Sequence, residues 1–263
     1  MSLVIKSALS GTRNNLQNQL LAVHALIAGL DEVGRGPLAG PVVVAAALSD
    51  GRTLPEGMND SKLLNHNSIT SLSASLKQSL QGFIIVQKDA AEIDRLNIYQ
   101  ATKRAMLEAL DGLNPQPQVA ISDAMPLPEA KIEVYDLVKA DLSEECVMAA
   151  SILAKCERDL VMAQYDDIYP QYGFASHKGY PTARHLQALI QYGITPIHRL
   201  SYQPVLEALI YHRAQLMQWL EEATLNKKVD LLNRVLKIKR PSKGFCPKQF
   251  SEGLLWLRKS VGL

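Results

Sequence analysis

Four acidic residues stand where strands or loops would present them together. Asp31 and Glu32 end a short apolar run, Asp123 ends another, and Asp141 precedes a helical segment. Strand ends at one edge of an open sheet converge on a shared crevice, so acids far apart in sequence can meet there. Carboxylates held close together repel one another unless cations neutralise them, and Mg²⁺ and Mn²⁺ prefer oxygen ligands. The pattern therefore indicates metal-assisted attack of water on a phosphodiester.

The spacing of these acids leaves a structural alternative open. An aspartate at the end of a strand is often a turn former or a helix cap. Neighbouring residues on a regular strand also point to opposite faces. Asp31 and Glu32 could therefore reach one metal only if the strand breaks there, which the glycine at position 34 permits.

The elements expected to position the acids are strands and helices of ordinary length. Apolar runs of β type occupy residues 26–30, 42–48, 83–86, 119–121 and 132–138. Helical spacing covers residues 91–110, about 143–168, 182–192 and 201–223, the last with Pro204 in its first turn. The early turn rich in Gly and Pro favours an antiparallel strand pair, and the later pattern favours parallel extension. We expect an α/β fold: a mixed β-sheet flanked by helices, with a helical C-terminal extension.

Charge is distributed unevenly along the 263 residues. Residues 224–263 contain ten Lys and Arg against Asp230 and Glu252, a net of +8, whereas residues 1–223 carry 18 basic and 24 acidic residues, a net of −6. A basic segment on an acidic body suggests an anionic partner such as nucleic acid, although a solvated helical tail would carry the same charges. We expect an extension at 1–25, a catalytic domain at 26–223 and a basic appendage at 224–263.

Composition favours a cytoplasmic protein. No apolar run reaches the roughly 20 residues that a bilayer span requires. Residues 1–20 have neither the apolar core nor the cleavage site of a secretory signal. Three widely spaced cysteines, at 146, 156 and 246, make neither a disulfide framework nor a zinc site. We expect a monomer with reduced thiols and no membrane association.

A series of motifs occurs in order between about residues 27 and 205. They are LDEVGRGPLAGPV at 30–42, NDSKLL at 59–64, ISD at 121–123, KAD at 139–141 followed by AASILAK at 149–155, and KGYPT at 178–182 followed by HRLS at 198–201. In kind and order they resemble the motifs of the bacterial ribonuclease HII family. Five ordered motifs make this resemblance highly specific.

The resemblance implies a ribonuclease H-like fold and an endonuclease that depends on Mn²⁺ or Mg²⁺. It implies hydrolysis of the RNA strand of RNA–DNA hybrids, and incision of duplex DNA 5′ to embedded ribonucleotides that leaves 3′-OH and 5′-phosphate ends. The implied catalytic and metal-binding acids are Asp31, Glu32, Asp123 and Asp141. The implied substrate-binding residues are Gly34, Arg35, Gly36, Lys62 and Tyr180.

The chemistry of the implied substrate-binding residues agrees with that role. Glycines let the backbone approach a sugar–phosphate closely, and the 2′-OH that distinguishes RNA can bond to backbone groups. An aromatic ring at 180 can stack on a sugar or base, and Arg35 and Lys62 suit phosphate contacts. Without the resemblance, residues 34–36 would be interpreted as a turn, Tyr180 as packing and Lys62 as a surface charge or a partner of Asp60. His198 is expected to be structural, since the family's metal site is built of carboxylates.

Four positions depart from the family's pattern. Ala124 and Ala140 stand where glycine is common, Val33 where alanine is common, and Tyr202 where phenylalanine is common. Alanine restricts the backbone more than glycine does, so the loops at 124 and 140 are the places where metal spacing or rate would differ.

Three other functions compete with this interpretation. The sister ribonuclease HIII family typically lacks the arginine of the Gly-Arg-Gly motif and carries a further N-terminal domain, for which the N-terminal segment here is too short. A binding protein that has lost catalysis would lack one of the acids, and none is missing. An interaction module acting through its basic tail would leave the acids and the Gly-Arg-Gly motif unexplained.

Overall fold

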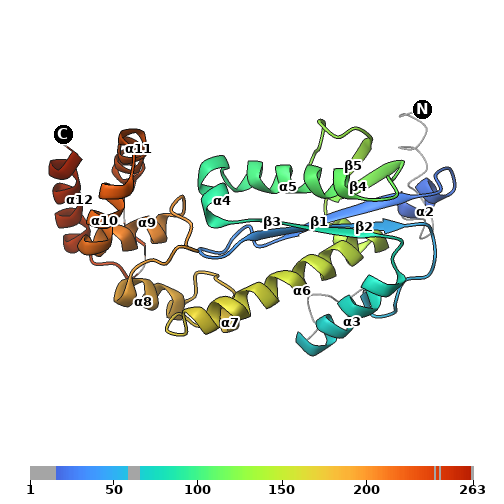
Figure 1. Ribbon diagram of the computed structural model, residues 1–263, viewed down its shortest axis with the longest axis horizontal. Helices are drawn as coiled ribbons and strands as arrows, with labels where there is room; N and C mark the ends of the chain where they lie inside the picture. The colour runs from blue at the N-terminus through green and yellow to red at the C-terminus, as the bar shows by residue number, and fades with distance from the viewer. Residues whose placement is uncertain (1–15, 59–65, 240, 243, 262–263) are drawn as a thin grey trace. The chain divides into compact units, whose positions relative to one another are not determined.

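Apolar and alanine-rich runs form a five-stranded mixed sheet (Figure 1). The strands are β1 (Ile27–Val33), β2 (Val42–Ser49), β3 (Phe83–Lys88), β4 (Val119–Asp123) and β5 (Glu133–Leu137), in the order β3-β2-β1-β4-β5. β2 pairs antiparallel with β1 and β3, whereas β4 pairs parallel with β1 and β5. The mixed sheet expected from the sequence is therefore confirmed.

The structure is a computed structural model that describes residues 16–58, 66–239, 241–242 and 244–261. The chain divides into two compact units. The first comprises the described residues of Met1–Arg35, Val42–Lys88 and Tyr99–Arg158, and it contains the whole sheet. The second comprises Gly36–Pro41, Asp89–Ile98 and the described part of Asp159–Leu263, and it is helical.

Helices cover both faces of the sheet in the first unit. Alternate residues of β2 separate into two sets, because successive side chains on a strand point to opposite faces. Val44, Ala46 and Leu48 pack with α5 (Ile98–Gly112). Residues 43, 45 and 47 pack instead with α3 (His66–Ser79) and with the start of α6 (Glu145–Ile168).

Gly29 allows the first turn of α6 to lie directly against β1. A Cβ atom at position 29 would stand 2.2 Å from the carbonyl carbon of Cys146 and 2.4 Å from the backbone nitrogen of Val147. Any side chain there would force the helix away from the strand. The short 3-10 helix η2 (Ala140–Leu142) immediately precedes this turn, so the close approach fixes the segment that carries Asp141 near the sheet.

The first strand runs further than its apolar residues suggested. β1 continues through Asp31 and Glu32 to Val33, so the strand does not end at Leu30 and does not break at these acids. Its pairing with β4 ends at Leu30, but its pairing with β2 continues to Val33 opposite Val43. One bonded neighbour is enough to keep the backbone extended, whatever the polarity of the side chains.

Two long helices expected from periodicity are each divided in two. Residues 91–110 fall into α4 (Ala90–Leu96) and α5, because Asn97 adopts a left-handed φ of 67°. The 201–223 segment falls into α9 (Gln203–Tyr211) and α10 (Arg213–Glu222), which meet at His212, and Pro204 lies in the first turn of α9 as expected. The helix expected to end near residue 168 is α6. α3 had no counterpart among the expected elements.

Most of the remaining described helices belong to the second unit. They are α7 (Phe174–His177), α8 (Ala183–Tyr192), α11 (Leu225–Leu236) and α12 (Pro247–Val261). Thr182 caps α8, its side chain accepting a hydrogen bond from the backbone N–H of His185 at 3.3 Å. A short helix, α2 (Leu16–Leu21), packs in the first unit beside Ile27 and Val147. Among the described residues, no helix is long and apolar enough to cross a membrane.

Candidate active site

Asp31 is the most constrained of the four predicted acids. It is buried, with 5% of its surface exposed, and one carboxylate oxygen accepts the backbone N–H of Glu32 at 2.7 Å. Burial raises the pKa of Asp31 to about 8, and the negative charges of Glu32 and Asp123 raise it further, against a hydrogen bond from Ser151 that lowers it. Asp31 therefore lies in a place that disfavours its own charge unless a cation is close.

Glu32 lies beside Asp31 and is held by an arginine. Its Oε1 accepts from Arg35 at 3.3 Å, an ion pair whose arginine is 44% exposed. Burial raises the pKa of Glu32 to about 7 and Asp123 adds to the rise, while Arg35 lowers it. The other oxygen, Oε2, is buried and has no hydrogen-bond partner among the described residues. A buried acceptor of this kind is costly and suits a ligand that can satisfy it.

Asp123 and Asp141 are joined through the segment between β5 and α6. A carboxylate oxygen of Asp123 accepts the backbone N–H of Ala140 at 2.9 Å, which ties the end of β4 to η2. Asp141 follows within η2 and is 9% exposed. All four predicted acids thus belong to the first unit, and the charges of Asp31, Glu32 and Asp123 act on one another.

These acids have the chemistry of a divalent-cation site, although their oxygens do not already surround one metal position. Hard carboxylate oxygens, mutual repulsion and an unsatisfied buried oxygen all favour Mg²⁺ or Mn²⁺. Among the described residues, no group of three or more acid, histidine or cysteine side chains already surrounds a single metal position. Asp31 and Glu32 are successive residues of an unbroken strand, which explains why their side chains start from opposite faces.

Ser151 is a residue of this cluster that the sequence analysis did not single out. It lies on α6 and its side chain hydrogen-bonds to Asp31. The sequence feature that could have identified Ser151 is its polarity, because the other residues of the run from Ala149 to Ala154 are apolar.

The predicted substrate-binding residues are divided between the two units. Gly34 and Arg35 follow β1 in the first unit, and Gly34 has a φ of 99° that favours glycine. Gly36 and Tyr180 belong to the second, where a Cβ at position 36 would lie 3.4 Å from the Tyr180 ring. The ring is 45% exposed, as a stacking surface requires. Lys62 lies outside the described residues.

Comparison with known proteins assigns the family. The Ribonuclease HII family model matches residues 28–205. A ribonuclease HII of Desulfitobacterium hafniense is 45% identical over 183 residues, which are 70% of each chain. One from Coxiella burnetii is 44% identical over 188 residues, 72% of this chain and 93% of that one. The chain belongs to the ribonuclease HII family. It is therefore a ribonuclease H, a hydrolase that acts on RNA–DNA hybrids.

A solved structure agrees with this assignment. The ribonuclease H2 of Pyrococcus horikoshii OT3 is similar to this chain, with a TM-score of 0.63 and 29% identity over 70% of this chain and 96% of that one. Ribonuclease HII enzymes depend on divalent metal ions, in keeping with the carboxylate chemistry of the cluster.

Three buried histidines hold the ribonuclease HII motif that carries Tyr180. His198 Nδ1 accepts the backbone N–H of Thr195 at 2.9 Å, so its Nε2 carries the proton and donates to His185 Nε2 at 3.0 Å. His185 in turn donates from Nδ1 to the carbonyl of Tyr180 at 3.0 Å. His177 Nδ1 accepts the backbone N–H of Gly179 at 3.2 Å. His198 is thus fully engaged in this network, consistent with the structural role expected for it.

Arg199 performs a similar task for the segment that contains Gly36. It is fully buried and donates to the carbonyl of Gly40 from Nε at 3.0 Å and from Nη2 at 2.8 Å. Its own backbone N–H donates to the carbonyl of Leu38 at 2.9 Å. The His-Arg-Leu-Ser motif therefore shapes the loops of the second unit through hydrogen bonds, a role that motif spacing could not reveal.

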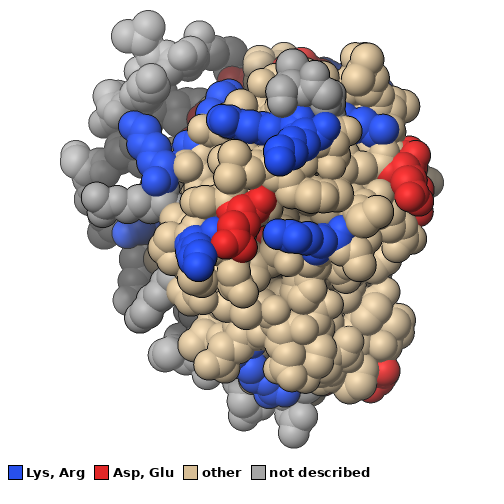
Figure 2. Space-filling view, turned by 90° about the vertical axis from the view of Figure 1, so that its left-hand side faces the viewer, with Lys and Arg blue, Asp and Glu red and all other residues tan. Residues whose placement is uncertain are grey.

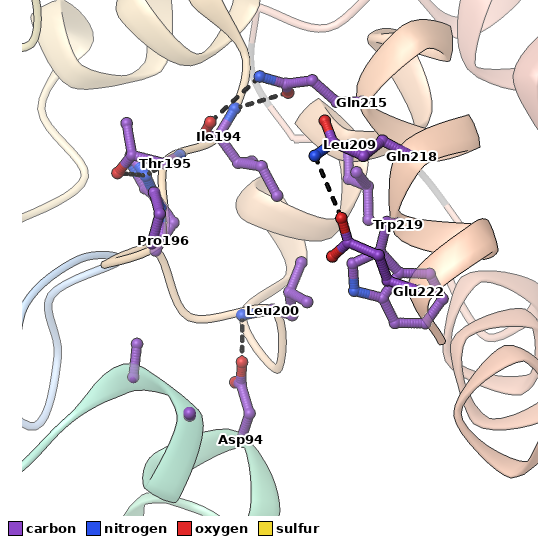
Figure 3. Close-up of a pocket in the computed structure, with 13 residues that line it drawn as sticks. Asp94, Ile194, Thr195, Pro196, Leu200, Leu209, Gln215, Gln218, Trp219 and Glu222 are labelled. Carbon is purple, nitrogen blue, oxygen red and sulfur yellow. Dashed lines mark hydrogen bonds between the residues drawn. The ribbon is translucent and has the colours of Figure 1, made fainter. Parts of the chain in front are cut away.

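A pocket of about 350 Å³ in the second unit lies beside the same motif (Figure 3). Two of its polar side chains are already used to hold the 194–201 loop. Asp94 accepts the backbone N–H groups of Leu200 at 2.8 Å and Ser201 at 2.7 Å, and Gln215 exchanges two hydrogen bonds with the backbone of Ile194. The pocket contains none of the four predicted catalytic acids, and we assign it no part in hydrolysis.

Proposed function

We propose that Asp31, Glu32, Asp123 and Asp141 bind divalent ions and form the catalytic centre of this ribonuclease HII. The observation that carries the proposal is the mutual charge repulsion of buried Asp31 with the partly buried Glu32 and Asp123, combined with the buried Oε2 of Glu32, which has no hydrogen-bond partner among the described residues. A cluster of this kind is expensive to maintain unless it serves a cation. We propose Mg²⁺ or Mn²⁺ as that cation.

The proposed reaction is hydrolysis of a phosphodiester on the 5′ side of a ribonucleotide. A water oxygen bonds to phosphorus as the bond from phosphorus to the upstream O3′ breaks, and the proton lost by water balances the one gained by O3′. The products are a 3′-OH end and a 5′-phosphate end. Bound divalent ions would supply Lewis-acid stabilisation of the charge that develops on the phosphate.

The chain's own residues orient the acids for this reaction. Ser151 holds the carboxylate of Asp31, Arg35 holds one oxygen of Glu32, and the Ala140 N–H holds Asp123. Glu32 keeps its buried Oε2 for a ligand. Because these donors are already fixed, less free energy is spent on reorienting the carboxylates during the reaction.

Recognition of the ribonucleotide is proposed for the Gly-Arg-Gly segment and Tyr180, with Lys62 at a phosphate. Gly34 and Gly36 would bring backbone groups to the 2′-OH, which is present in RNA and absent in DNA. The exposed ring of Tyr180, lying against Gly36, would stack on the following nucleotide. Incision at a single ribonucleotide embedded in DNA follows from recognition of one 2′-OH.

The test is cleavage of a DNA duplex that contains one ribonucleotide, with Mg²⁺ or Mn²⁺, by the wild type and by Asp31→Asn. We expect metal-dependent incision 5′ to the ribonucleotide and a loss of at least about a hundredfold in the variant, the scale of losing an essential charge at the reacting centre. Asp136→Asn is the matched control, because Asp136 is an exposed acid on β5, which pairs with β4 and not with β1, and the variant should keep wild-type activity.

Two outcomes would overturn the proposal. Equal activity of Asp31→Asn and wild type would remove Asp31 from the catalytic centre. Cleavage of long hybrids without incision at a single ribonucleotide would leave the family activity intact and refute the proposed substrate preference.

A further inference from the structure

The basic segment at residues 224–263 lies outside the part of the chain that matches the family. The family model ends at Val205, and the segment carries a net charge of +8 on a chain whose net charge is +2. The motifs that define the family therefore do not account for this charge.

The described part of the segment is folded onto the second unit. α11 and α12 bury Leu231, Leu232, Val235, Phe250 and Leu257 in a cluster shared with α9 and α10. Gly253 of α12 lies so close to α9 that a Cβ there would stand 2.6 Å from a side-chain carbon of Ile210.

Hydrogen bonds also hold the connection between α11 and α12. The carboxylate of Glu207 accepts the backbone N–H of Ser242 with both oxygens, at 3.0 and 2.9 Å. The hydroxyl of Tyr211 donates to the carbonyl of Cys246 at 3.0 Å. The described part of the segment is therefore packed and hydrogen-bonded onto the second unit. The alternative of a loosely solvated tail does not apply to it.

The buried apolar residues of these helices face the second unit, whereas most of the basic residues are exposed, together with Leu225, Val229, Leu236 and Leu255. Exposed basic side chains are Lys227, Lys237, Lys239, Lys248, Arg258 and Lys259, which we call the C-terminal basic surface. In the described part of this segment, the ion pair found is Arg234 with Asp230 at 2.6 Å. Figure 2, which views the molecule from the side where α11 and α12 lie, shows most of the Lys and Arg of this face in its upper half, with acidic side chains near its centre and at its right edge.

Two of these charges stand where they oppose helix formation. Lys227 lies in the first turn of α11 and Lys248 in the first turn of α12, and neither first turn contains an acid. A positive charge near a helix N-terminus is unfavourable by about 0.3–1 kcal/mol. Helix stability therefore does not explain why lysine occupies these two positions.

We propose that the C-terminal basic surface binds the sugar–phosphate backbone of the RNA–DNA duplex, as a second contact apart from the catalytic centre. This inference rests on the hybrid as substrate. Contacts from lysines to phosphates position a duplex without reading its sequence. They release counterions, so they make affinity depend steeply on salt. The surface would strengthen substrate binding and leave the chemical step unchanged.

The experiment measures binding of a fluorescently labelled hybrid by anisotropy over a series of salt concentrations, with EDTA present to prevent cleavage. The test variant of the full chain is Lys227→Gln/Lys239→Gln/Lys248→Gln. The matched control is Arg52→Gln/Lys77→Gln/Lys131→Gln, which removes the same charge from exposed positions of the first unit. A second variant, with arginine at the three test positions, keeps the charge.

We expect the slope of log affinity against log salt to fall by roughly 2–3 in the test variant, about 0.9 for each lost phosphate contact. The control and the arginine variant should keep the wild-type slope. Hybrid cleavage at saturating substrate should be unchanged in all three variants. The thermal midpoint of the test variant should be equal to or above that of wild type, because two unfavourable helix charges are removed.

An unchanged slope in the test variant would overturn the inference. An equal fall of the slope in the test variant and the control would also overturn the inference, because the change in net charge alone would then explain the weaker salt dependence. Loss of binding to anionic phosphatidylserine vesicles without loss of hybrid binding would assign the surface to a membrane instead. Absence of incision at a single ribonucleotide by wild type, with the salt slopes as expected, would refute the proposed function and leave this inference standing.

Discussion

At the scale of single residues, the backbone of the loop after Asp123 is strained at Ala124. The sequence suggested a restricted loop here, but it did not show the strained conformation. Ala124 stands where the family commonly has glycine, and it adopts a positive φ of 49°. Its backbone N–H donates to the carbonyl of Leu137 at 2.9 Å, which keeps it in this conformation. An L-residue in the left-handed region costs about 1–2 kcal/mol relative to its right-handed form.

Ala124→Gly should therefore raise the free energy of unfolding by about 0.5–1 kcal/mol, the strain relieved less the greater freedom of glycine in the unfolded chain. Urea unfolding of wild type and variant measures this difference. Ala74→Gly, at an exposed position inside α3, is the control and should lower stability by about 1 kcal/mol. Destabilisation by both substitutions would show that the loop is not strained.

At the scale of elements, the turn that carries Tyr180 depends on histidines that stay neutral. Burial lowers the pKa of His185 to about 4 and that of His198 to about 3, below the usual value near 6.5. The unfolded chain therefore takes up protons at a higher pH than the folded chain does. Stability from this network is complete above about pH 6.5 and is lost as pH falls toward 4.

In His198→Asn the free energy of unfolding should fall less steeply between pH 6.5 and 4 than it does in wild type. The difference in slope should be up to about 1.4 kcal/mol per pH unit. Denaturant unfolding at several pH values measures this, and the variant should be less stable than wild type at pH 8 because its bonds to Thr195 and His185 change. His24→Asn, in the first unit and outside the network, serves as control and should keep the wild-type pH dependence. Identical pH profiles for His198→Asn and wild type would contradict a neutral network.

At the scale of the whole molecule, the C-terminal helices contribute to the core of the second unit as well as to its charge. α12 packs on α9, and the buried side chains of Leu206, Leu209 and Ile210 lie in the cluster that α11 and α12 complete. Removing the appendage would expose these side chains, each worth about 1.5–3 kcal/mol when fully buried.

A chain that ends at Ala223 should melt at a lower temperature than the full chain and should associate through the uncovered face of α9. Thermal unfolding and light scattering after gel filtration measure these two effects. An equal melting temperature and a monodisperse truncated chain would show that the appendage does not support the core. Substitution of surface lysines is for this reason a cleaner test of substrate binding than truncation.

The sequence by itself determined the strands, the mixed sheet and the family. The apolar runs at 42–48 and 119–121 are short, buried on both faces and bounded by turn residues, so local composition was sufficient to place β2 and β4. The ordered motifs carry the family because chemistry requires particular residue types at those points. Substrate-binding roles for residues 34–36, 62 and 180 remain predictions, since no contact with substrate bears on them.

Tertiary structure decided what local pattern could not. β1 runs past Leu30 because β2 continues to pair with it, and Ser151 reaches Asp31 because Gly29 lets α6 approach the strand. The pairing of His185 with His198 joins residues from two motifs, and the tautomer of each ring depends on this contact together with a hydrogen bond to nearby backbone. Burial and neighbouring charge, which set the pKa values of Asp31 and Glu32, are sums over the folded molecule and have no signature in any single stretch of sequence.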